Sequence, residues 1–244
     1  FGFDSPNEIQ EKFVGAISDT KDPGLIILEA PMGIGKTEAS LVAVEELIYK
    51  TNRSGLFFGL PTQATSNGMF TRVEDWLESL SRDLESNASI RLAHSKASLN
   101  DNYTSLAKNV DLENEEGSVI INEWFSGRKQ TALDDFIIGT VDQFLLLALK
   151  QKHLALRHLG FTKKVVVIDE VHAYDCYMMQ YLKEALRWMG AYKVPVIILS
   201  ATLPKKRRLE LVENYMRGGG LKWKEVKKPK EVLSTAYPLS LIHI

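Results

Sequence analysis

Hydrophobic residues along the chain gather in five short continuous runs, with stretches of helical periodicity between them. The runs are rich in Val, Ile and Leu and do not alternate with polar residues, which is typical of strands buried on both faces. They cover Leu25–Leu28, Leu56–Leu60, Phe136–Ile138, Val165–Ile168 and Val196–Leu199. The intervening pattern predicts helices over Thr37–Lys50, Gly68–Leu80, Val141–Lys150 and Tyr177–Met189.

Repeated strand–helix units predict an α/β fold, with a mostly parallel, doubly wound sheet and helices on both of its faces. In such sheets the chemistry lies at the carboxyl ends of the strands. We expect one domain over residues 1–217, with a polar surface insertion at about 95–117. Residues 218–244 begin with three glycines and a basic stretch and end in apolar residues, which predicts a linker and then a strand that leads onward.

A P-loop sequence, Ala30–Thr37 (APMGIGKT), lies between the first predicted strand and the first predicted helix. Two glycines allow the backbone to curl, so that its N–H groups and the helix N-terminus face a β-phosphate. Lys36 is expected to reach the β- and γ-phosphates, and the Thr37 hydroxyl to bind Mg²⁺. Ala30 stands where a P-loop usually has glycine, but the strand before and the helix after disfavour a chance turn. The predicted ATP-binding residues here are Gly33, Ile34, Gly35, Lys36 and Thr37.

An acidic pair, Asp169 and Glu170, follows the predicted strand Val165–Ile168. Asp169 is placed to hold the Mg²⁺ shell, and Glu170 to orient and deprotonate an attacking water. Such a pair also occurs simply because helix N-termini favour negative charge, but the upstream P-loop favours the metal interpretation. His172 is expected to link the γ-phosphate site to a neighbouring element. The sequence therefore predicts ATP and Mg²⁺ as cofactors, with Glu170, Lys36 and His172 as catalytic residues.

The amino-acid composition limits the class of protein and the cellular compartment that we expect. The 244 residues are 45% hydrophobic and 25% charged, which is ordinary for a globular chain with a full core. The net charge of −1 gives no general attraction to nucleic acid, so any strand must be bound by local groups. One cysteine, Cys176, fits a reducing cytoplasm, and no apolar run is long enough to span a membrane. The first residues resemble no signal peptide, and the missing initial Met suggests a piece of a longer protein.

Three motifs together resemble the first RecA-like motor domain of superfamily 2 helicases. Residues 169–172 (DEVH) resemble a DExH box, residues 200–202 (SAT) helicase motif III, and residues 2–10 (GFDSPNEIQ) a Q motif. The resemblance implies that Gln10 reads the adenine edge. It further implies that Ser200 and Thr202 couple hydrolysis to movement.

A narrower resemblance rests on five segments: residues 60–67 (LPTQATSN), 122–125 (NEWF), 139–143 (GTVDQ), 169–175 (DEVHAYD) and 200–204 (SATLP). Together they resemble the CRISPR-associated helicase–nuclease of type I systems, over about residues 2–204. The resemblance implies ATP-driven movement along single-stranded DNA, 3′ to 5′ in that family, after recruitment by an RNA-guided CRISPR surveillance complex.

Contacts to the DNA strand are also implied by this resemblance. Hydroxyls, amides and backbone N–H groups at strand ends bind phosphate without net positive charge. Thr62 and Asp142 could instead cap the helices that follow, and the sequence leaves this open. The basic run Lys205–Arg208 is expected to be a solvated helix face. The implied strand-contacting residues are Pro61, Thr62 and Gln63 (motif Ia) and Thr140, Asp142 and Gln143 (motif Ic).

Two parts of the resembling family are expected outside this chain. The five histidines include no His-Asp pair, so the HD nuclease is expected elsewhere, as is the second RecA-like domain with its arginine finger. We therefore expect the chain alone to hydrolyse ATP slowly or not at all. Two alternatives remain: a domain of another superfamily 2 helicase acting on RNA or DNA, or a nucleotide-dependent interaction module. The intact Glu170 disfavours the second.

Overall fold

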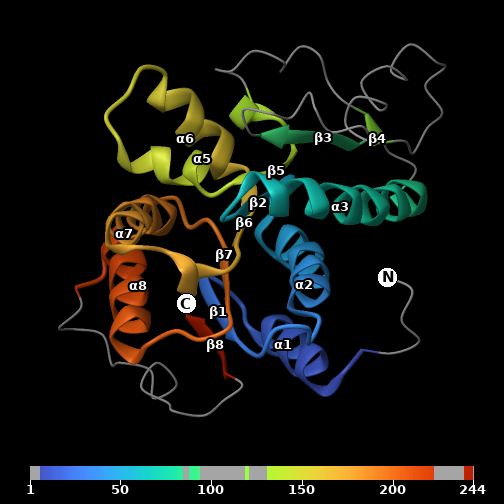
Figure 1. The fold of residues 1–244 in the computed structure, drawn as a ribbon, viewed down its shortest axis with the longest axis horizontal. Helices are drawn as coiled ribbons and strands as arrows, with labels where there is room; N and C mark the ends of the chain where they lie inside the picture. Colours follow the sequence, from blue (N-terminus) through green and yellow to red (C-terminus); the bar gives the residue numbers. More distant parts are fainter. Residues whose placement is uncertain (1–5, 85–87, 94–118, 121–130, 223–238, 244) are drawn as a thin grey trace.

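The computed structural model describes residues 6–84, 88–93, 119–120, 131–222 and 239–243, whose strands form one eight-stranded sheet (Figure 1). The strand order is β4-β3-β5-β2-β6-β7-β1-β8. All neighbours pair in parallel except β1 and β8, which are antiparallel. The strands are β1 (Leu25–Glu29), β2 (Gly55–Leu60), β3 (Ala88–Ala93), β4 (Val119–Ile120), β5 (Phe136–Thr140), β6 (Lys164–Ile168), β7 (Val196–Ser200) and β8 (Leu239–His243).

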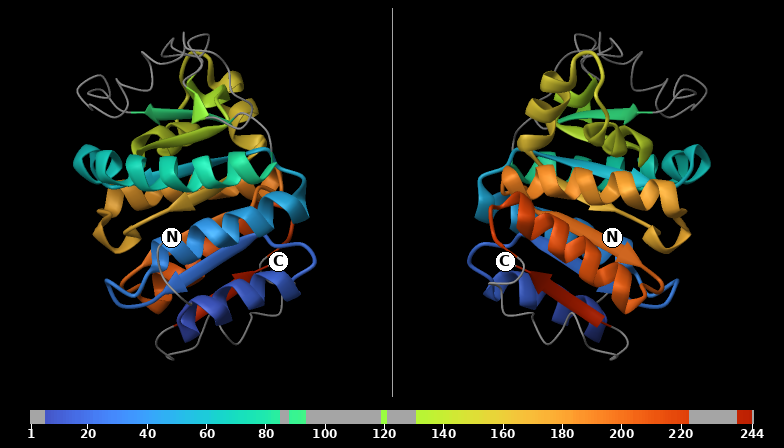
Figure 2. Two further views of the ribbon diagram at one scale, coloured as in Figure 1. Left: turned by 90° about the vertical axis from the view of Figure 1, so that its right-hand side faces the viewer. Right: turned by 90° about the vertical axis from the view of Figure 1, so that its left-hand side faces the viewer.

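Helices cover both faces of the sheet (Figure 2). One face carries α1 (Glu8–Asp19), α2 (Lys36–Thr51) and α3 (Gln63–Leu84). The other carries α5 (Asp142–Leu145), α6 (Leu154–Thr162), α7 (Cys176–Ala191) and α8 (Lys205–Gly218), together with the short 3₁₀ turn η4 (Leu146–Ala148). Two further 3₁₀ turns are η3 (Thr131–Leu133) and η5 (Val171–Ala173). The predicted mostly parallel, doubly wound α/β fold is confirmed.

Successive strand residues enter opposite cores, which explains the continuous apolar runs. In β1, Leu25 and Ile27 pack with the helices α5–α8, whereas Ile26 and Leu28 pack with α1–α3. Side chains of a strand alternate between faces, so in a sheet covered on both sides consecutive residues along the middle of a strand are apolar. The five predicted strands therefore match β1, β2, β5, β6 and β7 to within two residues.

The helix predictions needed correction at two places. Helix α3 begins at Gln63, five residues before the predicted start at Gly68. The helix predicted over Val141–Lys150 is instead the four-residue α5 followed by the turn η4, after which Leu149 is extended. Helices α1 and α6 and strands β3 and β4 were not predicted.

The strand predicted near the C-terminus forms as β8, but it pairs antiparallel with β1 along the edge of this same sheet. The chain's continuation from there to a further domain stays a prediction. The expected insertion at 95–117, the motif at 122–125, residues 2–5 of the Q motif and residues 223–238 of the linker lie outside the described residues. Within the described part of the chain, no helix is both long and apolar enough to cross a membrane.

Candidate nucleotide-binding site

The loops that carry the predicted nucleotide motifs meet at one edge of the sheet. Strands β6, β7 and β1 are neighbours, and the DEVH, SAT and P-loop segments follow their carboxyl ends. The Ala30 N–H, at the start of the P-loop, donates to the Ser200 carbonyl of the SAT segment at 3.1 Å. Sheet order therefore brings together three motifs that are far apart in the sequence.

The P-loop has the backbone that its glycines predict. Gly33 and Gly35 lie at φ 77° and 78°, in the left-handed region that favours glycine. Gly35 is the N-cap of α2, so Lys36 and Thr37 open that helix. Lys36 is 8% exposed, and its ammonium donates to the carbonyls of Ala30 (2.9 Å) and Pro31 (2.8 Å). The loop thus curls around the lysine that is expected to bind phosphate.

Helix α1 is attached to the tip of the P-loop through Asn7, a residue that the sequence analysis missed. The Asn7 Oδ1 accepts from the N–H groups of Ile9 and Gln10, and the Asn7 Nδ2 donates to the Ile34 carbonyl at 2.9 Å. The Gln10 Nε2 donates to the Gly35 carbonyl at 3.1 Å, and its Oε1 accepts from the Asn7 N–H. The signal was present: Asn7 and Gln10 have the spacing of a capping box.

These contacts fix the orientation of two P-loop peptide groups. In a trans peptide the carbonyl and the N–H point in opposite directions. Because the Ile34 and Gly35 carbonyls face α1, the N–H groups of Gly35 and Lys36 point away from it. A side chain at Gly35 would also collide with α1, since a Cβ there would lie 2.4 Å from the Gln10 Nε2. The Q-motif helix therefore orients donors that a phosphate needs.

Asp169 sits at the end of β6, 9% exposed, and burial raises the pKa of its carboxyl to about 6. The Glu170 N–H donates to Asp169 Oδ1 at 2.8 Å, and the positive charge of Lys36 acts to lower the same pKa. Lys36 and Asp169 are therefore close enough to interact across the site. The Asp169 carboxylate and the Thr37 hydroxyl, which stands in the first turn of α2, are hard oxygen donors of the kind that Mg²⁺ prefers, so the chemistry of these residues fits that ion.

Glu170 has a left-handed backbone, φ 55°, which is uncommon for a residue with a side chain. Its Oε2 lies 3.1 Å from His172 Nε2, and the Ala201 N–H points to His172 Nδ1 at 3.4 Å. Because a backbone N–H can only donate, Nδ1 is an acceptor and the proton of a neutral His172 lies on Nε2. The Ser200 hydroxyl donates to the Thr202 carbonyl at 2.8 Å. His172 thus bridges the DEVH and SAT segments.

The two segments that the resemblance implies in DNA contact also lie side by side, on the other half of the same edge of the sheet. Strands β2 and β5 pair in register, with Leu60 opposite Thr140, and the Val141 N–H donates to the Leu60 carbonyl at 2.8 Å. The exposed Thr62 accepts from the Thr65 N–H at 3.2 Å, so Thr62 does cap α3. The capping alternative is therefore supported for Thr62.

Asp142 behaves differently from Thr62. It is exposed within α5, whose N-cap is Val141 without a side-chain cap, so the capping alternative is wrong for Asp142. Gln143 is held by Arg157, which donates to its carbonyl (2.9 Å) and to its Oε1 (3.3 Å). Thr140 is buried, 8% exposed, which makes it the least accessible of the six implied strand contacts. Pro61 and Gln63 are half-buried beside Thr62.

One expectation about charge was wrong. The run Lys205–Arg208 opens α8, yet Arg208 is only 5% exposed and lies 3.7 Å from the Glu29 carboxylate (Nη1 to Oε2). Its neighbour Arg207 donates to the Tyr174 carbonyl at 3.5 Å. The run is therefore not simply a solvated helix face.

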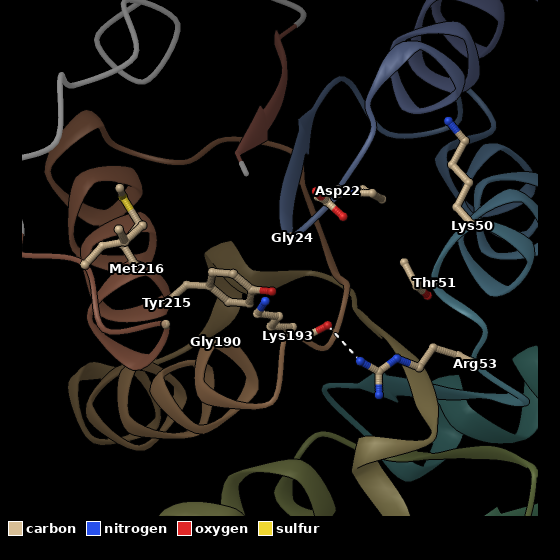
Figure 3. A pocket seen from close by; sticks show the side chains of 12 residues that line it. Asp22, Gly24, Lys50, Thr51, Arg53, Gly190, Lys193, Tyr215 and Met216 are labelled. Atoms are coloured by element: carbon tan, nitrogen blue, oxygen red, sulfur yellow. Dashed lines mark hydrogen bonds between the residues drawn. The ribbon is translucent and has the colours of Figure 1, made fainter.

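A cavity of about 470 Å³ lies at the opposite edge of the sheet, beside the residues that precede β1, β2 and β7 (Figure 3). Arg53 donates there to the carbonyls of Thr162, Tyr192 (3.2 Å) and Lys193 (2.9 Å). Cations at helix C-termini satisfy carbonyls that the helix leaves unpaired. This cavity is therefore separate from the predicted nucleotide site.

A doubly wound sheet with a P-loop, an acidic pair and a SAT segment on one edge defines a helicase-type P-loop NTPase domain. A family model for the DEAD/DEAH box helicases matches residues 7–210, and the chain belongs to this family. The chain is 59% identical over 243 residues to the CRISPR-associated nuclease/helicase Cas3 of Streptococcus thermophilus, an alignment that covers 98% of this chain and 26% of that protein.

Solved structures that match this chain point to the same family. The structure of T. fusca Cas3 with ATP matches with a TM-score of 0.83 and 36% identity, over 97% of this chain and 25% of that one. A chain in a CRISPR RNA-guided surveillance complex before nicking matches with a TM-score of 0.68 and 33% identity, over 96% of this chain and 22% of that one. The resemblance seen in the motifs is confirmed. The chain spans about a quarter of the length of these relatives.

Proposed function

We propose that this chain is the ATP-binding motor domain of an ATP-dependent single-stranded DNA translocase or helicase that acts in CRISPR interference. The observation that carries the proposal is the bridge from Glu170 through His172 to the SAT segment. The bridge connects Glu170, which is proposed to activate water, with the loop of Ser200 and Thr202, which is proposed to couple ATP hydrolysis to movement. The T. fusca relative with ATP supports the nucleotide, and the relative in a surveillance complex supports the pathway.

The nucleotide is held from two directions. Gln10 contacts the adenine edge, and the N–H groups of Gly33, Ile34 and Gly35 with the Lys36 ammonium bind the phosphates. The Thr37 hydroxyl and the Asp169 carboxylate hold Mg²⁺, which neutralises charge on the phosphates when it is bound. The pre-oriented P-loop peptides support this arrangement.

Glu170 acts as the general base. Its Oε2 faces His172 Nε2, so Oε1 is the oxygen that accepts a proton from the attacking water. His172 keeps the Glu170 carboxylate in place by donating a hydrogen bond to it. Ser200 and Thr202 then couple the state of this site to movement along the strand.

Single-stranded DNA lies over the loops that follow β2 and β5. Pro61, Thr62 and Gln63 contact its backbone from one loop, and Thr140, Asp142 and Gln143 from the other. The adjacency of the two loops supports a continuous binding edge. Contacts of this kind position a strand and read no sequence.

Two further domains and one binding partner complete the proposed function. A second RecA-like domain provides the arginine finger, an HD nuclease domain cuts DNA, and an RNA-guided CRISPR surveillance complex recruits the whole in the cytoplasm. The relatives, about four times as long as this chain, support such additional parts.

The test measures ATP turnover by the full-length protein, with single-stranded DNA, RNA or no nucleic acid. We expect stimulation by DNA, and we expect Glu170→Gln to keep ATP bound while turnover falls about 10²–10⁴-fold. Stimulation by RNA alone would instead support another superfamily 2 helicase. Equal turnover in wild type and Glu170→Gln would contradict the assigned base, and ATP binding without any turnover would support the interaction module.

A further inference from the structure

A buried ion pair, Glu29 with Arg208, lies beside the P-loop and belongs to none of the helicase motifs discussed above. Glu29 is the last residue of β1, and Arg208 lies in the first turn of α8, just after the SAT segment. The Arg208 Nη1 is 3.7 Å from the Glu29 Oε2, and their side chains are only 6% and 13% exposed. Two charges withdrawn from water in this way are costly to bury, so the pair invites a functional explanation.

The position of Glu29 places a negative charge at the entrance to the P-loop. The next residue is Ala30, whose carbonyl accepts a hydrogen bond from the Lys36 ammonium. Leu28 faces the α1–α3 side of the sheet, so the alternation of side chains directs Glu29 towards α8. Only one peptide unit therefore separates the carboxylate residue from the loop that is proposed to bind phosphates.

An unbalanced carboxylate at this point would oppose phosphate binding. Like charges repel strongly where water is excluded, and ATP carries several negative charges. The Glu29 Oε2 is buried and receives no hydrogen bond from the part of the chain that the structure describes. The guanidinium of Arg208 is the positive charge that faces it.

We propose that Arg208 is a positioning residue of the nucleotide site, which acts through Glu29 and does not touch the nucleotide. Arg208 neutralises the carboxylate behind the P-loop, and this keeps the loop attractive to phosphates. The same ion pair ties helix α8, and with it the SAT segment, to the strand that carries the P-loop. This inference rests on the proposed ATP-binding function.

The proposal predicts opposite effects of the two halves of the pair. Arg208→Met leaves the Glu29 carboxylate without the cation that faces it and should weaken ATP binding about fivefold, whereas Glu29→Gln removes the negative charge behind the P-loop and should keep or strengthen ATP binding. Arg208→Met should also lower the melting temperature, since it leaves the buried Glu29 carboxylate without the cation that faces it. The affinity effect of Arg208→Met should fall from ATP to ADP and vanish for adenosine, because it depends on the phosphate charge.

The experiment is calorimetric titration of the chain with Mg²⁺-ATP, Mg²⁺-ADP and adenosine. The double variant Glu29→Gln/Arg208→Met should return ATP affinity to within about twofold of wild type, as should Arg208→Lys, which retains the charge. Arg217→Met is the matched control, because Arg217 pairs with Glu213 on the surface of the same helix.

Equal weakening of ATP binding by Glu29→Gln and Arg208→Met would overturn the proposal and leave a purely structural ion pair. If Arg208→Met does not fold, Glu29→Gln and Arg208→Lys decide: weaker ATP binding in either contradicts the charge argument. A wild-type chain that binds no ATP would refute the proposed function itself. That outcome is distinct from failure of the Arg208 inference, which requires wild-type binding.

Discussion

The ammonium of Lys36 holds two carbonyls of its own loop, so this side chain serves both the loop and the predicted phosphate site. We expect Lys36→Ala to weaken ATP binding by about 2 kcal/mol or more, because one charge-assisted contact to the phosphates is lost. The fold should survive, since the apolar cores do not depend on this residue. Calorimetry gives the affinity and circular dichroism checks the fold. Wild-type ATP affinity in Lys36→Ala would refute the site assignment.

The buried carboxyl of Asp169 is predicted to destabilise the folded chain at neutral pH. Burial raises its pKa to about 6 from an ordinary value of 3.8, so the folded protein disfavours the charged form. Stability is therefore lost as the pH rises through this range, and the full cost is present at pH 7. We expect Asp169→Asn to stabilise the metal-free chain at pH 7 by on the order of 2 kcal/mol.

The measurement is thermal melting in the presence of a chelator, from pH 4.5 to 7.5. The difference between Asp169→Asn and wild type should shrink as the pH falls towards 4.5, because the carboxyl becomes protonated in the folded chain; it would vanish only below the ordinary pKa of 3.8, where both states are protonated. Asp19→Asn, the same substitution at an exposed position, is the matched control. A variant that melts below wild type at pH 7 would contradict the assignment of the raised pKa.

At the scale of elements, helix α1 is joined to the P-loop through Asn7, which caps the helix and also binds the Ile34 carbonyl. The two roles can be separated. Asn7→Asp keeps a capping oxygen but loses the Nδ2 donor, so we expect ATP affinity to fall several-fold while α1 stays folded. Asn7→Ala loses both and should also cost about 1 kcal/mol of stability.

Affinity by calorimetry and stability by urea unfolding provide the two readouts. Lys12→Ala, which removes only a surface ion pair on the same helix, is the matched control. Unchanged ATP affinity in Asn7→Asp would mean that α1 does not need this contact to orient the P-loop.

The elements that could be predicted were those whose signal is local. Strands such as β6 are continuous apolar runs because both faces are covered, and the P-loop is a compact sequence. Helix α1 was missed although its signal is also local: Ile9, Phe13, Val14 and Ile17 form an apolar stripe at helical spacing, and Asn7 with Gln10 forms a capping box. The contact between Arg208 and Glu29 could not be predicted, since it depends on which side of the sheet α8 lies.

For the molecule as a whole, the arginines near motif III limit what the chain can do alone. Arg208 is paired with Glu29, Arg207 reaches the Tyr174 carbonyl and Arg217 pairs with Glu213. We therefore expect the isolated chain to turn over ATP at least about 10³-fold more slowly than 1 s⁻¹, because an arginine finger is worth about that much or more. A phosphate-release assay with and without single-stranded DNA measures this. DNA-stimulated turnover near 1 s⁻¹ would require an arginine from a second copy.

Strand β8 protects the side of β1 that β7 does not cover. Without it, the strand that leads into the P-loop would present unpaired backbone groups to other molecules, and such edges promote aggregation. A chain shortened to end at Lys222 should therefore self-associate in a concentration-dependent way, which light scattering would detect. Strand β8 thus keeps the domain soluble by covering β1. A shorter protein that ends after α8 would lose this protection.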